Sequence, residues 1–213
     1  MLSFAIDTSS VFLSIAVFED SDCIYSLLFK PSALSKILID IIDKTLKTLN
    51  IRDFTDFEKY YITTGPGKYT SLRVGIATLK GLLYGKGKMI LNINALDLLA
   101  TNMPSKNVIS VIPSSFPYVH YGIYHTLNRI EIGKTELEKL GEKIKPCLFV
   151  LCPEMHKIKQ FLHKETMICS DKLLNIPHAS NMLKVEKYVK ETKIEELVPI
   201  YDVRNKTVQS DYI

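Results

Sequence analysis

Glycine and lysine in one short segment make phosphate binding the first chemistry to consider. Residues 65–88 contain six of the nine glycines, five basic residues and no acidic residue. A P-loop needs Gly, four residues, then Gly-Lys-Ser/Thr, but here Ile62 and Tyr69 replace the first glycine and the hydroxyl residue. Thr70 likewise replaces the third glycine of a dinucleotide-binding motif. Both motifs therefore fail, and what remains is a helix N-terminus beside Lys68, which suits an anion.

Asp7 is the second candidate, at the end of the first expected strand, within Ile6-Asp7-Thr8-Ser9-Ser10. Actin-like ATPases and sugar kinases place an aspartate here to organise the water around magnesium. Those proteins repeat the arrangement in a second lobe, whereas the second half of this chain opens with the acid-free sequence VIPSSFP. Two interpretations stay open. Asp7, Thr8 and Lys68 contact a nucleotide or anion, or Asp7 hydrogen-bonds its own backbone at a turn.

Histidine spacing argues against a metal site. His120 and His125 lie five residues apart, so on one strand they point to opposite faces. His156 and His163 are two helical turns apart, about 10 Å. No serine or cysteine has the setting of a nucleophile. We therefore expect no metal and assign no catalytic residue.

Composition indicates a globular cytoplasmic protein. The 213 residues are 46% hydrophobic, enough for one large or two small domains. The formal charge of +4 is too small to argue by itself for nucleic-acid binding. The first residues lack a basic leader, and charges interrupt the most apolar helix candidate, so we expect neither export nor a membrane span. The four cysteines form no Cys-x-x-Cys pair, and we expect reduced thiols.

The expected elements form two lobes. Apolar runs predict strands at 3–7, 12–18, 24–29, 60–64 and 89–93, and three-and-four spacing predicts helices at 35–50, 70–84 and 95–102. These make a first α/β lobe over residues 1–105. The second lobe, 106–213, has expected strands at 108–112, 119–125, 129–132 and 148–151, and helices near 153–163 and 180–190. We expect its tail to pack back on the first lobe.

The helix at 70–84 has an apolar face and, beside it, a row of small residues formed by Ser71, Gly75 and Thr78. Small residues let a second helix approach closely. That second helix is either the one at 35–50 in the same lobe or part of another subunit, and the residues alone favour the same lobe. The basic residues Arg73, Lys80, Lys86 and Lys88 are candidate RNA contacts, although a solvated helix face is the commoner meaning.

With these motifs in hand, the chain resembles the TsaB (YeaZ) family, the small subunit of the bacterial machinery that makes threonylcarbamoyladenosine (t6A) in transfer RNA. The similarity rests on Ala5-Ile6-Asp7-Thr8-Ser9, on the apolar helix that follows the third strand, and on residues 65–77. Those last residues read GPGKYTSLRVGIA, where the family usually has GPGSFTGLRIGIA. Pro199-Ile200-Tyr201 matches the family's Pro-x-Tyr tail.

The resemblance implies an actin-like (ASKHA, ribonuclease H-like) α/β fold of two packed lobes with a degraded nucleotide site. It implies a non-catalytic scaffold, without a cofactor of its own, that binds a larger TsaD-type catalytic paralogue. A TsaE-type ATPase, ATP, a metal and transfer RNA belong to the rest of the complex, and isolated members can self-pair. In the family the two helices of the first lobe form the contact with the catalytic paralogue. The resemblance therefore favours an intersubunit role for the helix at 70–84, whereas the residues alone favour packing within the lobe. The implied interface residues are Ile37, Ile41, Ser71, Leu72, Gly75, Ile76, Thr78 and Leu79.

The second lobe departs from the family pattern. Pro113-Ser114-Ser115 replaces the usual Asp-Ala-Arg, Ala33 aligns with a frequent histidine, and Asp202 follows Tyr201 where an apolar residue is usual. The leading hypothesis is the scaffold subunit. The alternatives are an actin-like ATP-binding enzyme that uses Asp7 and the Gly65–Gly67 turn, and a small RNA-binding module.

Overall fold

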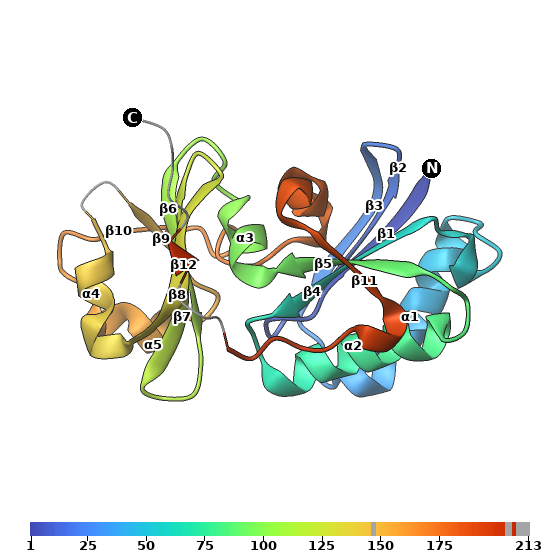
Figure 1. The fold of residues 1–213 in the computed structure, drawn as a ribbon, viewed down its shortest axis with the longest axis horizontal. Coiled ribbons are helices and arrows are strands. Elements are labelled where there is room, and N and C mark those ends of the chain that lie inside the picture. Colours follow the sequence, from blue (N-terminus) through green and yellow to red (C-terminus); the bar gives the residue numbers. More distant parts are fainter. Residues whose placement is uncertain (146–147, 203–205, 208–213) are drawn as a thin grey trace.

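Two six-stranded sheets, one in each lobe, build the protein (Figure 1). The structure is a computed structural model that describes residues 1–145 and 148–202 and the backbone of 206–207. The first sheet has the strand order β11-β5-β4-β1-β2-β3, and the second has the order β10-β9-β6-β7-β8-β12. None of the helices in the described residues is long and apolar enough to cross a membrane.

The first sheet begins as an antiparallel meander and continues with parallel strands. Strands β1 (Leu2–Asp7), β2 (Leu13–Glu19) and β3 (Asp22–Phe29) pair in sequence. Strand β4 (Lys59–Gly65) then pairs parallel to β1, and β5 (Met89–Asn94) pairs parallel to β4. The central strands are buried along almost their whole length because both faces of the sheet are covered.

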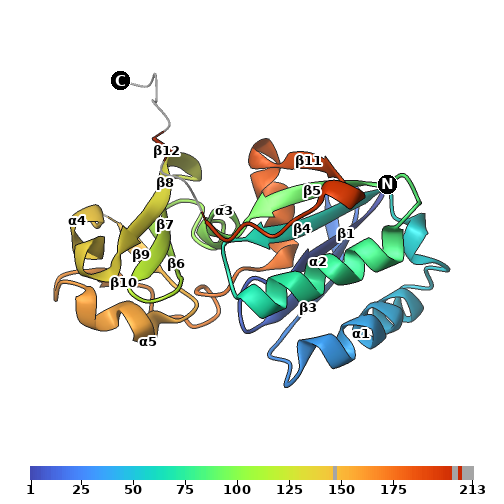
Figure 2. The ribbon, with the colours of Figure 1, turned by 60° about the horizontal axis from the view of Figure 1, so that its bottom comes forward.

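Helices α1 (Leu34–Thr48) and α2 (Tyr69–Leu83) lie side by side on one face of this sheet (Figure 2). Their apolar sides meet β1, β2 and β4 in a core that includes Leu38, Ile42, Ile76 and Leu79. The short 3-10 helix η1 (Phe54–Asp56) adds Phe54 to this core. The opposite face is covered by η4 (Ala179–Tyr188), a run of 3-10 turns.

The second sheet has shorter surrounding helices. Its strands are β6 (Asn107–Pro113), β7 (Tyr118–His125), β8 (Asn128–Glu136), β9 (Phe149–Leu151), β10 (Met167–Ile168) and β12 (Lys206–Thr207). Around it lie α3 (Ala95–Ala100), η2 (Leu137–Lys139), α4 (Leu140–Lys143), α5 (Met155–Ile158) and η3 (Lys159–Phe161). The predicted helix at 153–163 is thus two short helices, and the one near 180–190 is 3-10 rather than α.

The lobes divide the chain differently from the expected boundary at residue 105. Helix α3 packs with the core of the second sheet. Residues after 178 return to the first lobe, where Met182 and Val185 of η4 pack on its sheet. Strand β11 (Lys190–Lys193) then pairs with β5, and η5 (Ile194–Glu196) buries Ile194 in the core below α2. The return of the chain explains why no flexible linker is seen in the sequence.

The joint between the lobes is polar and well packed. Arg129 at the start of β8 donates from Nε to Oδ1 of the buried Asp97, at 2.9 Å, and from Nη2 to the other carboxylate oxygen. The Arg129 guanidinium also lies 4.4 Å from the ring centroid of Tyr188 in η4. The Tyr188 hydroxyl accepts from the Arg129 backbone and donates to the carbonyl of Leu127. These contacts tie η4 of the first lobe to the second sheet.

Candidate functional site

The Gly65–Gly67 turn is crossed closely by two other backbone segments. A Cβ at Gly65, whose φ is +130°, would lie 2.1 Å from the carbonyl oxygen of Ile200. A Cβ at Gly67 would lie 2.3 Å from the carbonyl oxygen of Ser9. Both distances are far below van der Waals contact, so only glycine fits at either position. The turn is glycine-rich because protein backbone occupies the space above it.

The segment over Gly65 is the C-terminal strap, which we define as residues 198–202. It runs from the first lobe across the start of α2 to the second lobe (Figures 1 and 2). The Ile200 amide donates to the carbonyl of Thr64 at 2.6 Å. The Tyr201 ring stacks on Tyr69 with 4.6 Å between centroids, and Asp202 pairs with Lys134 of β8 at 3.1 Å. The strap is thus held at both lobes.

Asp7 is fully buried at the end of β1, and its hydrogen bonds are internal. Its Oδ1 accepts from the Thr63 hydroxyl at 2.5 Å and from the Ser9 amide at 3.2 Å. Burial raises the pKa of the Asp7 carboxyl to about 6, against the opposing effect of these hydrogen bonds. Oδ2 of Asp7 and the hydroxyls of Thr8 and Ser9 are buried with no hydrogen-bond partner in the structure. The turn geometry expected for Asp7 is present, since the Ser9 amide lies two residues on.

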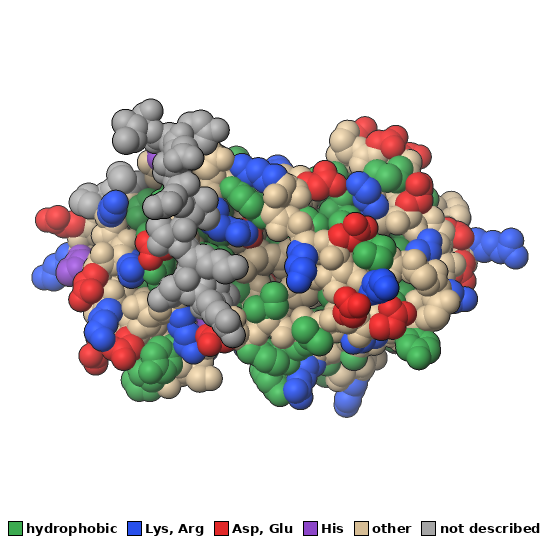
Figure 3. All heavy atoms as spheres, viewed as in Figure 1, with side chains coloured by type: hydrophobic (Ala, Val, Ile, Leu, Met, Phe, Trp, Pro, Cys, Tyr) green, Lys and Arg blue, Asp and Glu red, His purple; other side chains and the backbone are tan. Residues whose placement is uncertain are grey.

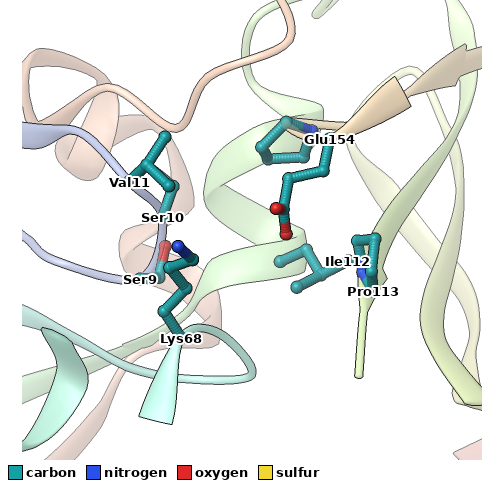
Figure 4. A pocket seen from close by; sticks show the side chains of 8 residues that line it. Ser9, Ser10, Val11, Lys68, Ile112, Pro113 and Glu154 are labelled. Carbon is teal, nitrogen blue, oxygen red and sulfur yellow. The ribbon is translucent and has the colours of Figure 1, made fainter. Parts of the chain in front are cut away.

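A small pocket opens between the lobes beside this turn (Figure 4). Lys68 and the loop at 9–11 line one wall, and the ends of β6 and β9 line the other. Figure 4 shows the Lys68 side chain on the side of Ser9, opposite the Glu154 carboxylate. Glu154 is also paired with Lys157 at 2.8 Å. An anion near Lys68 would therefore face a carboxylate across the pocket, which is unfavourable for a phosphate.

The eight predicted interface residues fall into two groups. Leu72, Gly75, Ile76 and Leu79 are buried within this chain and are not part of its surface, and their intersubunit role stays a prediction. A Cβ at Gly75 would lie 2.4 Å from Oγ1 of Thr8, so this glycine lets α2 approach the loop after β1. The other four residues remain partly exposed on the paired helices, and they are Ile37, Ile41, Ser71 and Thr78.

Comparison with known proteins identifies the family. A family model described as "TsaD: tRNA N6-adenosine threonylcarbamoyltransferase" matches residues 31–196, which is more than half of the chain. The chain belongs to this TsaD family. The match begins just before α1 and ends in η5, so it covers both helices of the first lobe and most of the second lobe.

Solved structures show the fold of this TsaD-family chain. A Pseudomonas aeruginosa protein described as similar to the peptidase YeaZ has a TM-score of 0.79 at 17% identity, over 95% of this chain and 99% of that one. YeaZ from the same organism has a TM-score of 0.77 at 18% identity, over 94% and 99%. The ethanolamine utilization protein EutJ of Carboxydothermus hydrogenoformans matches at 0.51 and 10% identity, over 83% and 88%. The two-lobed actin-like α/β fold implied by the TsaB (YeaZ) resemblance is confirmed.

Three of the four candidate RNA-contacting residues form hydrogen bonds within this TsaD-family chain. Arg73 donates from Nε to the Tyr201 hydroxyl at 2.9 Å, and its guanidinium lies 4.1 Å from the Tyr69 ring centroid. Lys80 donates to the Glu195 carbonyl at 2.9 Å. Lys88 donates to the carbonyls of Thr55 and Phe57 at 2.9 and 3.0 Å. These three cations contact the strap, η5 and η1, whereas Lys86 is exposed and has no such contact among the described residues.

Sequence analysis missed the strap's contact with the glycine turn and the outward residues of α2. Ala77 and Gly81 are exposed, and a Cβ at Gly81 would meet nothing within 4 Å. Two sequence features belong to the strap contact, the Pro-x-Tyr tail that contains Tyr201 and the aromatic residue Tyr69. Neither feature predicts that the two rings stack. Cys23, Cys152 and Cys169 are free thiols, and Cys147 lies outside the described residues.

Proposed function

We propose that this chain is the accessory, non-catalytic subunit of a t6A-forming complex, and that it binds and activates a larger TsaD-type catalytic subunit. Membership of the TsaD family and the YeaZ-like fold support this assignment. The observation that carries it is the strap over Gly65. In an actin-like ATPase this turn would have to admit phosphate, whereas here the Ile200 carbonyl and the Ser9 carbonyl lie against it.

The state of Asp7 supports the same conclusion against the ATP-binding alternative. A carboxylate that organises magnesium must be ionised and must reach the cleft. Asp7 is fully buried, and its Oδ1 is occupied by hydrogen bonds from Thr63 and Ser9, so the carboxylate does not reach the cleft. We therefore assign the binding of ATP and metal to the other subunits of the complex, which include a TsaE-type ATPase. Transfer RNA is the proposed substrate of the complex, and the cytoplasm is its proposed location.

The proposed docking surface consists of Ile37 and Ile41 on α1 and Ser71, Ala77, Thr78 and Gly81 on α2. These residues lie on two helices that run side by side at the surface of the first lobe (Figure 2). Figure 3 shows hydrophobic side chains over the start of α2, interspersed with basic ones. The open space at Gly81 allows close approach of a partner helix, as ridge-into-groove packing requires. A TsaD-type paralogue, or a second copy in its absence, is the proposed occupant.

Reconstitution tests this function. The chain, a TsaD-type subunit, a TsaE-type ATPase, transfer RNA, ATP and threonylcarbamoyl-adenylate as the activated donor are combined, and t6A is quantified by mass spectrometry of the digested RNA. We expect t6A only when the chain and the TsaD-type subunit are both present, and we expect the chain with Asp7→Asn to support the same yield. If the chain forms t6A without the TsaD-type subunit, or if Asp7→Asn abolishes the yield, the proposal is wrong.

A further inference from the structure

The pocket between the lobes carries opposite charges on its two facing walls. Lys68, immediately before α2, belongs to the first-lobe wall, and Glu154, immediately before α5, belongs to the second-lobe wall. In Figure 4 the Glu154 carboxylate points into the space toward the Lys68 side chain. Both residues are described, and they form no ion pair with each other. The space between the two charges is therefore open to a third group.

Each of these two charges has room for a further partner. The Lys68 ammonium has no hydrogen bond or ion pair to any of the described residues. One carboxylate oxygen of Glu154, Oε1, pairs with Lys157 at 2.8 Å, and the other, Oε2, has no partner among the described residues. The Glu154 side chain is only 19% exposed, so water solvates it incompletely. A second cation beside Oε2 would replace the missing hydration.

The first-lobe wall also contains a buried hydroxyl without a partner. Ser9 lines the pocket beside Lys68, and its carbonyl accepts from the Lys68 amide at 2.7 Å. Ser9 is 3% exposed, and its Oγ has no hydrogen-bond partner in the structure. The neighbouring Ser10 is already engaged, because its Oγ accepts from the Phe12 amide at 3.1 Å. Lys68 and Ser9 are thus two donors that suit a carboxylate at this wall.

The size and charge pattern of the pocket limit what it can bind. Measured out to its open mouth, the hollow encloses about 320 Å³, close to the lower end of the range for ligand sites. Val11, Ile112 and Pro113 give it an apolar lining between the charged groups. A lone anion at Lys68 would be repelled by Glu154, and a lone cation at Glu154 would be repelled by Lys68. A small molecule with both charges matches both walls.

We propose that this pocket binds a free α-amino acid with a short side chain. Its carboxylate accepts from Lys68 and Ser9, its ammonium group donates to Glu154, and its side chain packs on the apolar lining. The ligand would thereby connect the two lobes. The pocket shares no residue with the docking surface on α1 and α2, and the inference does not depend on the proposed function, since the chain alone is expected to bind.

Titration of the isotope-labelled full chain with L-serine, followed by the backbone amide signals in NMR spectra, tests the proposal. We expect saturable binding with a millimolar dissociation constant, and shifts centred on the amides of Ser9, Lys68 and Glu154. Acetate and ethylamine, which carry one charge each, should bind at least about tenfold more weakly than L-serine. No saturable binding of L-serine up to about 50 mM, or equal binding of acetate, overturns the proposal.

Neutral variants of the two charged residues locate the site. Lys68→Met and Glu154→Gln should each weaken L-serine binding about tenfold or more, because each removes the partner of one ligand charge. The matched controls are Lys86→Met and Glu165→Gln, at exposed residues outside the pocket, and both should bind as wild type does. The amide spectra confirm that all four variants fold. If Lys68→Met and Glu154→Gln bind L-serine as tightly as the controls, the assignment of this pocket is wrong.

Discussion

Asp7 is a buried carboxyl at the end of β1 whose hydrogen bonds, from Thr63 and Ser9, are internal to the lobe. Here its surroundings serve the turn after β1, and its second oxygen has no partner in the structure. The residue therefore contributes to the local structure of the loop at 8–10, and its protonation is linked to stability.

That linkage predicts how stability depends on pH. The pKa of Asp7 rises from an ordinary value of 3.8 to about 6 in the folded chain, so the folded state binds this proton more tightly. The stabilisation is complete below pH 3.8 and is lost as pH rises through 6. Wild type should lose roughly 2 to 3 kcal/mol between pH 4 and pH 7 that the Asp7→Asn variant does not lose. Urea unfolding of both proteins across this range measures the difference, and parallel pH profiles would contradict it.

Helix α2 shows at the level of one element how two glycines serve different purposes. Gly75 faces the Thr8 side chain in the core, and Gly81 faces open space at the surface. The sequence placed both in one glycine-rich window and gave no means to tell them apart, because the loop that approaches Gly75 comes from residues far away in the chain. The row of small residues expected to meet another subunit thus includes one residue, Gly75, that contacts the chain itself. The outward-facing small residues of α2 are Ala77 and Gly81.

A pair of matched alanine substitutions checks this account of α2. Gly75→Ala should destabilise the chain by about 1 to 3 kcal/mol, because the added methyl group collides with Thr8. Gly81→Ala should stabilise it by about 0.5 to 1 kcal/mol, since alanine favours the helix and meets no atom. Thr8→Ala should relieve much of the Gly75→Ala effect in a double-mutant cycle. Thermal or urea unfolding gives all four values, and equal effects of the two alanines would refute the assignment.

Local pattern predicted the elements well, and long-range contacts account for what it missed. The strand that became β4 and the helix that became α2 were placed within two residues, because apolar periodicity and the glycine turn mark them in the sequence. The sequence predicts that the tail packs back on the first lobe, but it does not predict the pairing of β11 with β5, the contact of the strap with Gly65 or the roles of Lys80 and Lys88. Each joins residues more than 30 positions apart, or depends on a backbone position that no local pattern encodes.

At the scale of the molecule, the two lobes are joined by α3, η4 and the strap. The Asp97 carboxylate is at the centre of one joint, where it accepts from Arg129 and, at 2.7 Å, from the hydroxyl of Tyr124. Burial raises the pKa of Asp97, and the Arg129 guanidinium opposes that shift. A buried charge of this kind is costly without its partner. These polar contacts add to the apolar packing of α3, whose Leu96 and Leu99 meet the second-sheet core and whose Leu98 meets η4.

Removing Arg129 tests this joint. Arg129→Met should destabilise the chain by about 3 kcal/mol, because it leaves the Asp97 charge buried and unpaired and removes the contact with Tyr188. Adding Asp97→Asn to that variant should recover part of the loss, since the unpaired charge is then gone. Urea unfolding of the single and double variants measures both values. A loss below about 0.5 kcal/mol for Arg129→Met would show that the pair contributes little.

We propose the outward side of α1 and α2 as the docking surface for a TsaD-type subunit, and the affinity between the two proteins tests this assignment. Isothermal titration of that subunit into the chain is compared for wild type, Gly81→Arg and the control Gln160→Arg, an exposed residue of the second lobe. We predict that Gly81→Arg weakens binding by at least about thirtyfold, roughly 2 kcal/mol, because arginine fills the space a partner helix needs. Gln160→Arg should bind as wild type does. Unchanged affinity for Gly81→Arg, or no binding by wild type, would contradict the account.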